Sequence, residues 1–173
     1  MKITTLAIAF AALTAPAYAQ DAAAPAADAT APAATETAAL QGDAAAGEEQ
    51  FGRQCVACHV VQDPATDEVL AGRNAQVGPN LYGVAGRVAG SVEGYAYGDG
   101  ITEYGETGAV WEEANFVAYV QDPTGFLRET LDNNRARGKM AYQVRDEAQA
   151  YDLYAYLATF GGDAAAAEPA ATN

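Results

Sequence analysis

The stretch Cys55-Val56-Ala57-Cys58-His59 contains both cysteines and the single histidine of the 173-residue chain. Two thiols at this spacing can each form a thioether bond with one vinyl group of a haem, and the neighbouring imidazole can then reach the iron. The stretch therefore predicts one covalent haem c, attached through Cys55 and Cys58, with His59 as an iron ligand.

Other uses of a Cys-x-x-Cys stretch fit this chain less well. Structural zinc takes four Cys or His ligands, and the chain has only three such residues. A thioredoxin-like redox site follows a strand, and no alternating run of β-branched or aromatic residues precedes Cys55. A plain disulfide between Cys55 and Cys58 remains open as the structural alternative.

The first 19 residues have the pattern of an export signal. Lys2 precedes an apolar stretch from 3 to 13, and Ala17-Tyr18-Ala19 is a small-residue cleavage site. We expect cleavage before Gln20 and a periplasmic protein. The apolar stretch is shorter than the ~20 residues of a membrane span, so a retained signal that anchors the protein is the weaker alternative.

The composition predicts one folded domain in a strongly acidic chain. The formal charge is −14, and it becomes −15 once Lys2 is removed with the signal, so nucleic acid and anionic membranes would repel the protein. Residues 20–41 are mostly Ala, Pro, Thr and acids and predict a disordered linker, and 161–173 predict a disordered acidic tail. The domain is then 42–160.

The domain reads as all-α. Asp43 is a good N-cap for a helix that leads to Cys55, and further helices are expected at about 112–121, 123–131 and 146–160. The last of these has one apolar face, made by Leu153, Tyr156, Leu157 and Phe160, before the Gly161-Gly162 stop. No strand pattern of any length is visible.

Met140 is the candidate for a second iron ligand. It is the only methionine outside the predicted signal, and it follows Gly138-Lys139 in a segment without helical periodicity. A thioether ligand favours ferrous iron and closes the site to substrates, which suits one-electron transfer. The alternative is that Met140 is ordinary core filler.

These features resemble the class I c-type cytochromes. The segments that carry the resemblance are Gly78-Pro79-Asn80-Leu81-Tyr82-Gly83, Gly86-Arg87, Gly94-Tyr95-Ala96-Tyr97, Trp111, Lys139-Met140 and Leu153-Tyr154-Ala155-Tyr156-Leu157. Long segments at 59–78 and 111–140 make the chain similar to the large bacterial cytochrome c-two group. The resemblance implies helices and long loops wrapped around one haem, with the first and last helices crossing where Gly47 meets Tyr156.

The resemblance also implies roles for individual residues. The Pro79 carbonyl would accept a hydrogen bond from the outer nitrogen of His59, and Tyr119 would approach the methionine sulfur. A buried haem propionate would be bound by Tyr97 and Trp111, with its charge offset by Arg87. Taken without the resemblance, Trp111 is an ordinary core residue and Tyr97 a surface turn residue.

Two features depart from the family pattern. Tyr142 stands where phenylalanine is usual, and outside the signal the chain keeps one lysine, whereas relatives commonly surround the haem edge with lysines. The segment 133–145 nevertheless holds four basic residues and no acid: Arg135, Arg137, Lys139 and Arg145. This basic segment is either a docking site for acidic partners or a solvated loop balanced by neighbouring acids.

We therefore expect an electron carrier and not an enzyme. The resemblance implies a monomeric shuttle that takes electrons from a cytochrome bc complex to a terminal oxidase, a photosynthetic reaction centre or another periplasmic redox enzyme. The rival is a haem enzyme or gas-binding protein with an open iron position. A peroxidase needs a distal histidine, and cytochromes c-prime carry Cys-x-x-Cys-His near the C-terminus, and this chain has neither feature.

Overall fold

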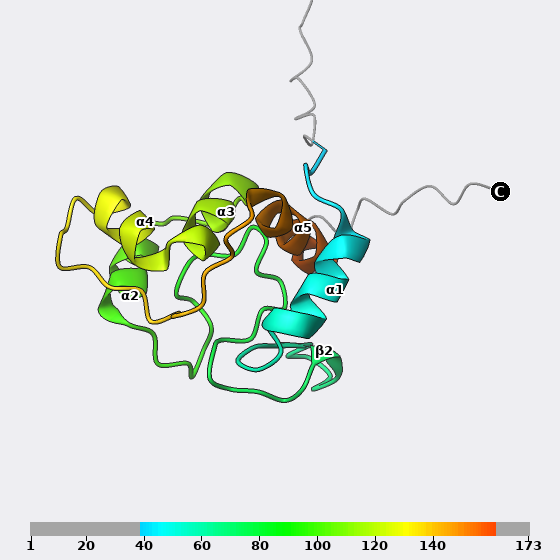
Figure 1. Ribbon diagram of the computed structural model, residues 1–173. Coiled ribbons are helices and arrows are strands. Elements are labelled where there is room, and N and C mark those ends of the chain that lie inside the picture. The colour runs from blue at the N-terminus through cyan, green and yellow to red at the C-terminus, as the bar shows by residue number, and fades with distance from the viewer. Residues whose placement is uncertain (1–38, 162–173) are drawn as a thin grey trace, which may run out of the picture. The chain divides into compact units, whose positions relative to one another are not determined.

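The computed structural model describes residues 39–161 (Figure 1). The predicted signal 1–19, the linker except for residues 39–41, and the tail beyond Gly161 lie outside the described residues. Long loops separate most of the helices, and the elements in chain order are α1 (Ala44–Gln54), β1 (Val60–Gln62), β2 (Val69–Gly72), α2 (Asp99–Glu106), α3 (Glu113–Gln121), α4 (Pro123–Thr130) and α5 (Glu147–Ala158).

The first and last helices cross at close range, as predicted. Asp43 accepts hydrogen bonds from backbone N–H groups in the first turn of α1, and its own N–H donates to Asp152 Oδ1 at 2.8 Å. At the crossing, a Cβ on Gly47 would overlap the Asp152 carbonyl and lie 2.7 Å from Tyr156 Cβ. Only glycine allows this approach of α1 to α5.

Helices α3 and α4 form where the sequence predicts them. Asp122 separates them, accepting a hydrogen bond from Gly125 N at 3.0 Å, and Pro123 occupies the first turn of α4, where its missing N–H costs nothing. After α4 the chain runs outside any helix until Asp146 caps α5 (Figure 1, yellow to orange). We call residues 132–145 the Met140 segment.

Helix α2 is absent from the sequence prediction. It contains two glycines and a threonine in eight residues, and its N-cap Gly98 makes no side-chain cap hydrogen bond, so its local signals are weak. Tertiary contacts hold it instead. Ile101 and Tyr104 are buried, and a Cβ on Gly100 would lie 2.9 Å from the carbonyl oxygen of Arg137 and 3.0 Å from Leu127 of α4.

The expectation that no strand is present was wrong. β1 and β2 form a short antiparallel hairpin with Val60 opposite Gly72 and an irregularity between Val61 and Gln62. Its strands span three and four residues and show no regular inside-outside alternation, so the sequence pattern could not reveal them. The side chain of Asn80 accepts from Gln62 N and donates to Gln62 O, which ties the hairpin to the loop after it.

Aromatic side chains form much of the core. Trp111 packs against Tyr104, Phe116 and Tyr119, with ring centroids 5.0–6.4 Å apart. The same cluster continues through Phe126 and Tyr154. None of the helices between residues 39 and 161 is both long and apolar enough to cross a membrane.

Candidate functional site

An apolar cavity of about 630 Å³ occupies the centre of the domain. Its volume lies within the range of ~300–1,000 Å³ that is typical of ligand and cofactor pockets. The structure places all nine site residues predicted from the sequence in its lining: Cys55, Cys58, His59, Pro79, Arg87, Tyr97, Trp111, Tyr119 and Met140. These residues span 86 positions of the chain, so the fold brings together side chains that the sequence keeps far apart.

His59 is held in a fixed orientation on one side of the cavity. Its Nδ1 lies 2.9 Å from the carbonyl oxygen of Pro79, which assigns the ring proton to Nδ1 and leaves Nε2 as the nitrogen with a free lone pair. Burial lowers the pKa of His59, and the bond to Pro79 raises it by a smaller amount. The imidazole is therefore neutral at physiological pH, the form that binds metals.

The two cysteines lie on the turn that follows α1. Cys55 is partly buried at the end of the helix, whereas Cys58 is exposed, and Cys58 N and His59 N both donate to the Cys55 carbonyl at 3.0 and 2.9 Å. Burial, with a smaller contribution from Cys58, raises the pKa of Cys55 to about 11. Its sulfur is thus a neutral thiol at pH 7.

The structure gives no support to the zinc alternative. Between residues 39 and 161, no group of three or more His, Cys, Asp or Glu side chains is arranged to hold a metal ion. The lining also fits a flat apolar ring far better than a small ion, because it includes many aliphatic and aromatic residues, among them Leu81, Val84, Ile101, Phe116, Val120, Val144, Leu153 and Leu157. The donors present therefore fit a haem.

Polar groups gather at one part of the lining. The guanidinium of Arg87 donates to the carbonyl oxygens of Tyr82 at 2.5 Å and Asn80 at 3.0 Å, which fixes its position. Burial lowers the pKa of Arg87 and the neighbouring Tyr97 raises it, while burial raises the pKa of Tyr97. A backbone hydrogen bond from Trp111 N to Arg87 O at 2.9 Å joins these two residues.

Met140 lies in the segment between α4 and α5, partly buried and packed on the core. Tyr119 of α3 lines the same cavity and packs against Trp111 at a centroid distance of 5.0 Å. Burial raises the pKa of Tyr119 to about 12, so its hydroxyl remains a proton donor across the physiological range.

The sequence did not predict that Tyr95 and Lys139 line the cavity. Lys139 Nζ donates to the Ala96 carbonyl at 2.6 Å and lies 5.5 Å from the centre of the Tyr95 ring. The Tyr95 hydroxyl in turn donates to the Val77 carbonyl at 2.9 Å. Tyr95 stood within a quoted motif, but its bonds reach residues 18 and 44 positions away, and no local pattern signals such contacts.

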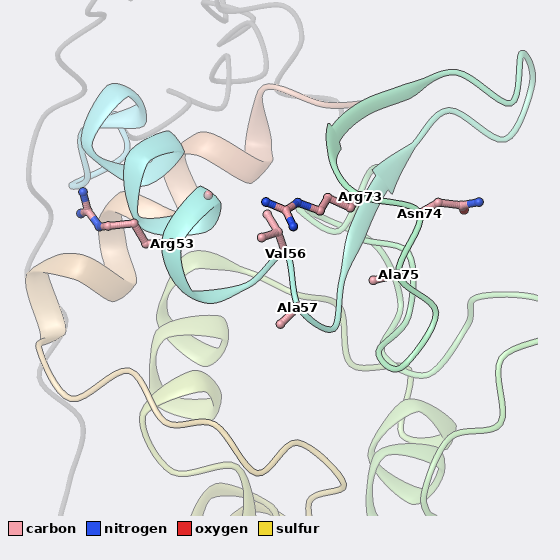
Figure 2. A pocket seen from close by; sticks show the side chains of 7 residues that line it. Arg53, Val56, Ala57, Arg73, Asn74 and Ala75 are labelled. Carbon is pink, nitrogen blue, oxygen red and sulfur yellow. The ribbon is translucent and has the colours of Figure 1, made fainter.

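A second pocket of about 590 Å³ lies on the outside of the cysteine turn (Figure 2). Val56 and Ala57, the residues between the cysteines, line it, whereas Cys55 and Cys58 line the central cavity. Two arginines border it: Arg53, which pairs with Glu49 at 3.1 Å, and Arg73, whose side chain extends toward Val56 in Figure 2. We call this pocket the arginine groove.

Known proteins resemble this chain in both sequence and fold. No family model matches the chain. The cytochrome c2 of Rhodovulum adriaticum is 58% identical over 122 residues, which cover 70% of this chain and 95% of that protein. A cytochrome c2 of Cereibacter sphaeroides is 48% identical over 118 residues, covering 68% of this chain and 94% of the relative.

Solved structures agree with the sequence relatives. The crystal structure of cytochrome c2 from Rhodobacter sphaeroides matches with a TM-score of 0.67 and 46% identity, covering 70% of this chain and 98% of that one. This confirms the predicted fold class. The chain therefore belongs to the class I c-type cytochromes of the cytochrome c2 group, which are electron carriers with a covalently attached haem and not enzymes.

Proposed function

We propose that the protein is a periplasmic one-electron carrier whose single haem is attached through Cys55 and Cys58 and ligated by His59 and Met140. The observation that carries this proposal is that these four side chains line one apolar cavity, with the His59 ring already fixed by the Pro79 carbonyl. When bound, the haem iron supplies a reversible one-electron couple. The protein contributes by holding the haem in one position and by excluding water from it.

The two proposed ligands, His59 and Met140, have different roles. His59, with its proton on Nδ1 facing the Pro79 carbonyl, presents Nε2 as a strengthened donor in one orientation. Met140 offers a soft thioether, which favours the reduced state and fills the position at which substrates would otherwise bind. The Tyr119 hydroxyl remains protonated and is the donor we expect to approach the Met140 sulfur.

The polar part of the lining suits the haem carboxylates. Arg87 carries its positive charge in a partly buried position fixed by two backbone carbonyls, and Tyr97 and Trp111 lie in the same lining with O–H and N–H donors. Charge-assisted bonds to a carboxylate are stronger than neutral ones, and they satisfy groups whose burial is otherwise costly. We therefore assign these three residues to a haem propionate.

Export follows from the N-terminal sequence. Residues 1–19 carry the charge, apolar stretch and cleavage site of a secretory signal, and attachment of haem c to a Cys-x-x-Cys-His stretch after secretion fits the periplasm. We expect the mature protein to begin at Gln20 and residues 20–41 to act as a linker. A carrier that keeps its signal as an anchor would instead remain in washed membranes with Met1 to Ala19 intact.

The expected partners are a cytochrome bc complex as donor and a terminal oxidase, a reaction centre or another periplasmic redox enzyme as acceptor. The basic residues of the Met140 segment support docking with an acidic surface. Arg135, Arg137 and Lys139 are all exposed and lie within five residues of Met140. Electron transfer needs only a brief encounter, so a small electrostatic contact beside the cavity is sufficient, and the carrier itself works as a monomer.

Optical spectra of the purified holoprotein test the ligand pair. The oxidised protein should show the weak near-red sulfur-to-iron absorption, and the reduced protein should not bind carbon monoxide. Met140→Leu keeps the volume of the side chain but removes the sulfur, so it should abolish that absorption, lower the reduction potential and admit carbon monoxide. An unchanged spectrum in Met140→Leu would rule out Met140 as the ligand.

A further inference from the structure

Three loops that border the cavity meet at Tyr95. The Tyr95 hydroxyl donates to the carbonyl of Val77, two residues before the proline that fixes His59. The Tyr95 ring faces the ammonium of Lys139, the residue before Met140, at 5.5 Å. The loop that carries the imidazole and the segment that carries the thioether are thus joined through one side chain.

Lys139 is attached at a second point. Its Nζ donates to the Ala96 carbonyl at 2.6 Å, 43 positions away in the chain, and its aliphatic stem passes Gly98, where an added Cβ would lie 3.5 Å from Lys139 Cγ. An exposed lysine is ordinarily free in solvent because its rotamer entropy opposes any single weak contact. Here a charge-assisted hydrogen bond and a cation–π contact act on the same ammonium group.

These residues belong to the cavity that contains Met140. Val77, Tyr95, Gly98 and Lys139 all line it together with Met140. The Met140 segment has no helix or strand of its own, so its position depends on contacts at scattered points. One of these is the backbone bond from Val144 N to Val120 O at 2.9 Å, which fixes the end of the segment near α5.

We propose that Lys139 and Tyr95 form a clasp that keeps the Met140 segment closed over the cavity and so limits the entry of small neutral ligands. They are positioning residues, because they act through the segment and not on the iron. This inference rests on the proposed role of Met140 as the sixth ligand. A ligand such as imidazole can reach the iron only when the sulfur leaves, and the clasp opposes that opening.

Each half of the clasp can be removed separately. Lys139→Met keeps most of the stem but removes both contacts of the ammonium, Tyr95→Phe removes only the bond to Val77, and Tyr95→Leu removes the ring as well. Lys139→Arg should keep the contacts with the Ala96 carbonyl and the Tyr95 ring, because it replaces the ammonium with a planar cation. Arg145→Met is the matched control, because Arg145 is an exposed residue of the same segment and the substitution removes the same charge.

The measurement is the rate of imidazole binding to the oxidised holoprotein at pH 7, followed by the loss of the sulfur-to-iron absorption. We expect a three- to tenfold faster rate in Lys139→Met and near wild-type rates in Lys139→Arg and Arg145→Met. Tyr95→Leu should also accelerate binding. Combining it with Lys139→Met should give less than the product of the two effects, since both changes remove the same cation–π contact.

The outcomes separate the clasp from the proposed ligation. A wild-type protein that lacks the sulfur-to-iron absorption would overturn the Met140 assignment, and the clasp with it. If that absorption is present, equal rates in the wild type and Lys139→Met, or equal acceleration by Lys139→Met and Arg145→Met, would overturn the clasp alone. Strict multiplication of the Tyr95→Leu and Lys139→Met effects would show that the two side chains act independently, and would also overturn it.

Discussion

The Nδ1 atom of His59 lies 2.9 Å from the carbonyl oxygen of Pro79, and the residue before that proline is a glycine in contact with the same imidazole. Gly78 N also donates to the Cys58 carbonyl at 2.7 Å. The loop at 78–79 therefore holds the histidine twice, by a hydrogen bond to its ring and by a backbone surface on which the ring rests.

Gly78→Ala should displace the imidazole. A Cβ at Gly78 would lie 2.6 Å from His59 Nδ1 and 2.7 Å from Nε2, so either the ring or the loop must move. We expect a loss of about 1–3 kcal/mol in the free energy of unfolding and a changed haem spectrum. Denaturant unfolding followed by absorption measures both.

Gly52→Ala is the control for this substitution. Gly52 lies in α1, and an added Cβ would meet no atom within 4 Å. Since alanine favours helix more than glycine does, Gly52→Ala should stabilise the protein by about 0.5–1 kcal/mol. Equal stability of the Gly78→Ala variant and the wild type would contradict the close packing of the ring.

Gln50→Leu should stabilise the protein. Gln50 is only 2% exposed, and its Nε2 is buried without a hydrogen-bond partner among the described residues. An unsatisfied buried donor costs about 1–3 kcal/mol, and leucine has a similar shape without the polar group. The gain should appear as a higher denaturant midpoint with an unchanged slope.

The exposed residue Gln149 provides a control for the Gln50→Leu substitution. Gln149 lies in α5 and is exposed, so Gln149→Leu should change the free energy of unfolding by less than about 0.5 kcal/mol. Destabilisation of the protein by Gln50→Leu would contradict the inference that the Gln50 amide is unsatisfied.

Tyr119 should be the tyrosine that resists ionisation most. Burial raises its pKa to about 12, above the ordinary value of 10, so the folded state favours the protonated phenol. A raised folded-state pKa gives stability that is fully present below pH 10 and is lost as the pH rises through 12. Ultraviolet titration should show a late phenolate step that Tyr119→Phe removes. A Tyr119→Phe variant that keeps that late step would assign it to another tyrosine.

Local signals explain which parts of the fold could be predicted. Asp43, Pro123 and Asp146 each mark a helix start by chemistry that acts within a few residues, and all three helices begin where these residues indicate. Helix α2 and the β1–β2 hairpin have weak propensities and form through contacts with distant segments. A single amino-acid sequence contains no direct signal of such long-range contacts.

The same distinction applies to the cavity. His59 and Met140 could be named as candidate ligands because the chain has one histidine and one methionine outside the predicted signal, and the family resemblance supports the same choice. Tyr95 and Lys139 were not paired in advance, because ten tyrosines compete for any such role and only the fold decides which one meets the lysine. The apolar lining was likewise hidden, since its residues come from many separate segments.

The docking prediction concerns the conflict between a formal charge of −14 and a basic Met140 segment. If the overall field dominated, the protein would favour basic partners. Charge effects in physiological salt extend only about 8 Å, so at contact the local groups should decide, and an acidic partner should meet Arg135 and Arg137. Reversing both to Glu should slow electron transfer to the native acceptor, mainly through the association rate, and reduce its decline with added salt.

Two arginines of the arginine groove provide a control in which the net charge changes by the same amount as in the Arg135 and Arg137 reversal. Arg53→Glu combined with Arg73→Glu alters the overall field as much as the Arg135 and Arg137 reversal does, but it acts on the outer side of the cysteine turn. We expect this variant to retain most of the wild-type association rate, because that rate should depend on the charges nearest the contact. Stopped-flow rates at several salt concentrations distinguish the possibilities. Equal slowing by both double reversals would mean that net charge governs the encounter. Slowing by the Arg53 and Arg73 reversal alone would place the partner at the arginine groove. Wild-type rates that rise with salt concentration would rule out an acidic partner.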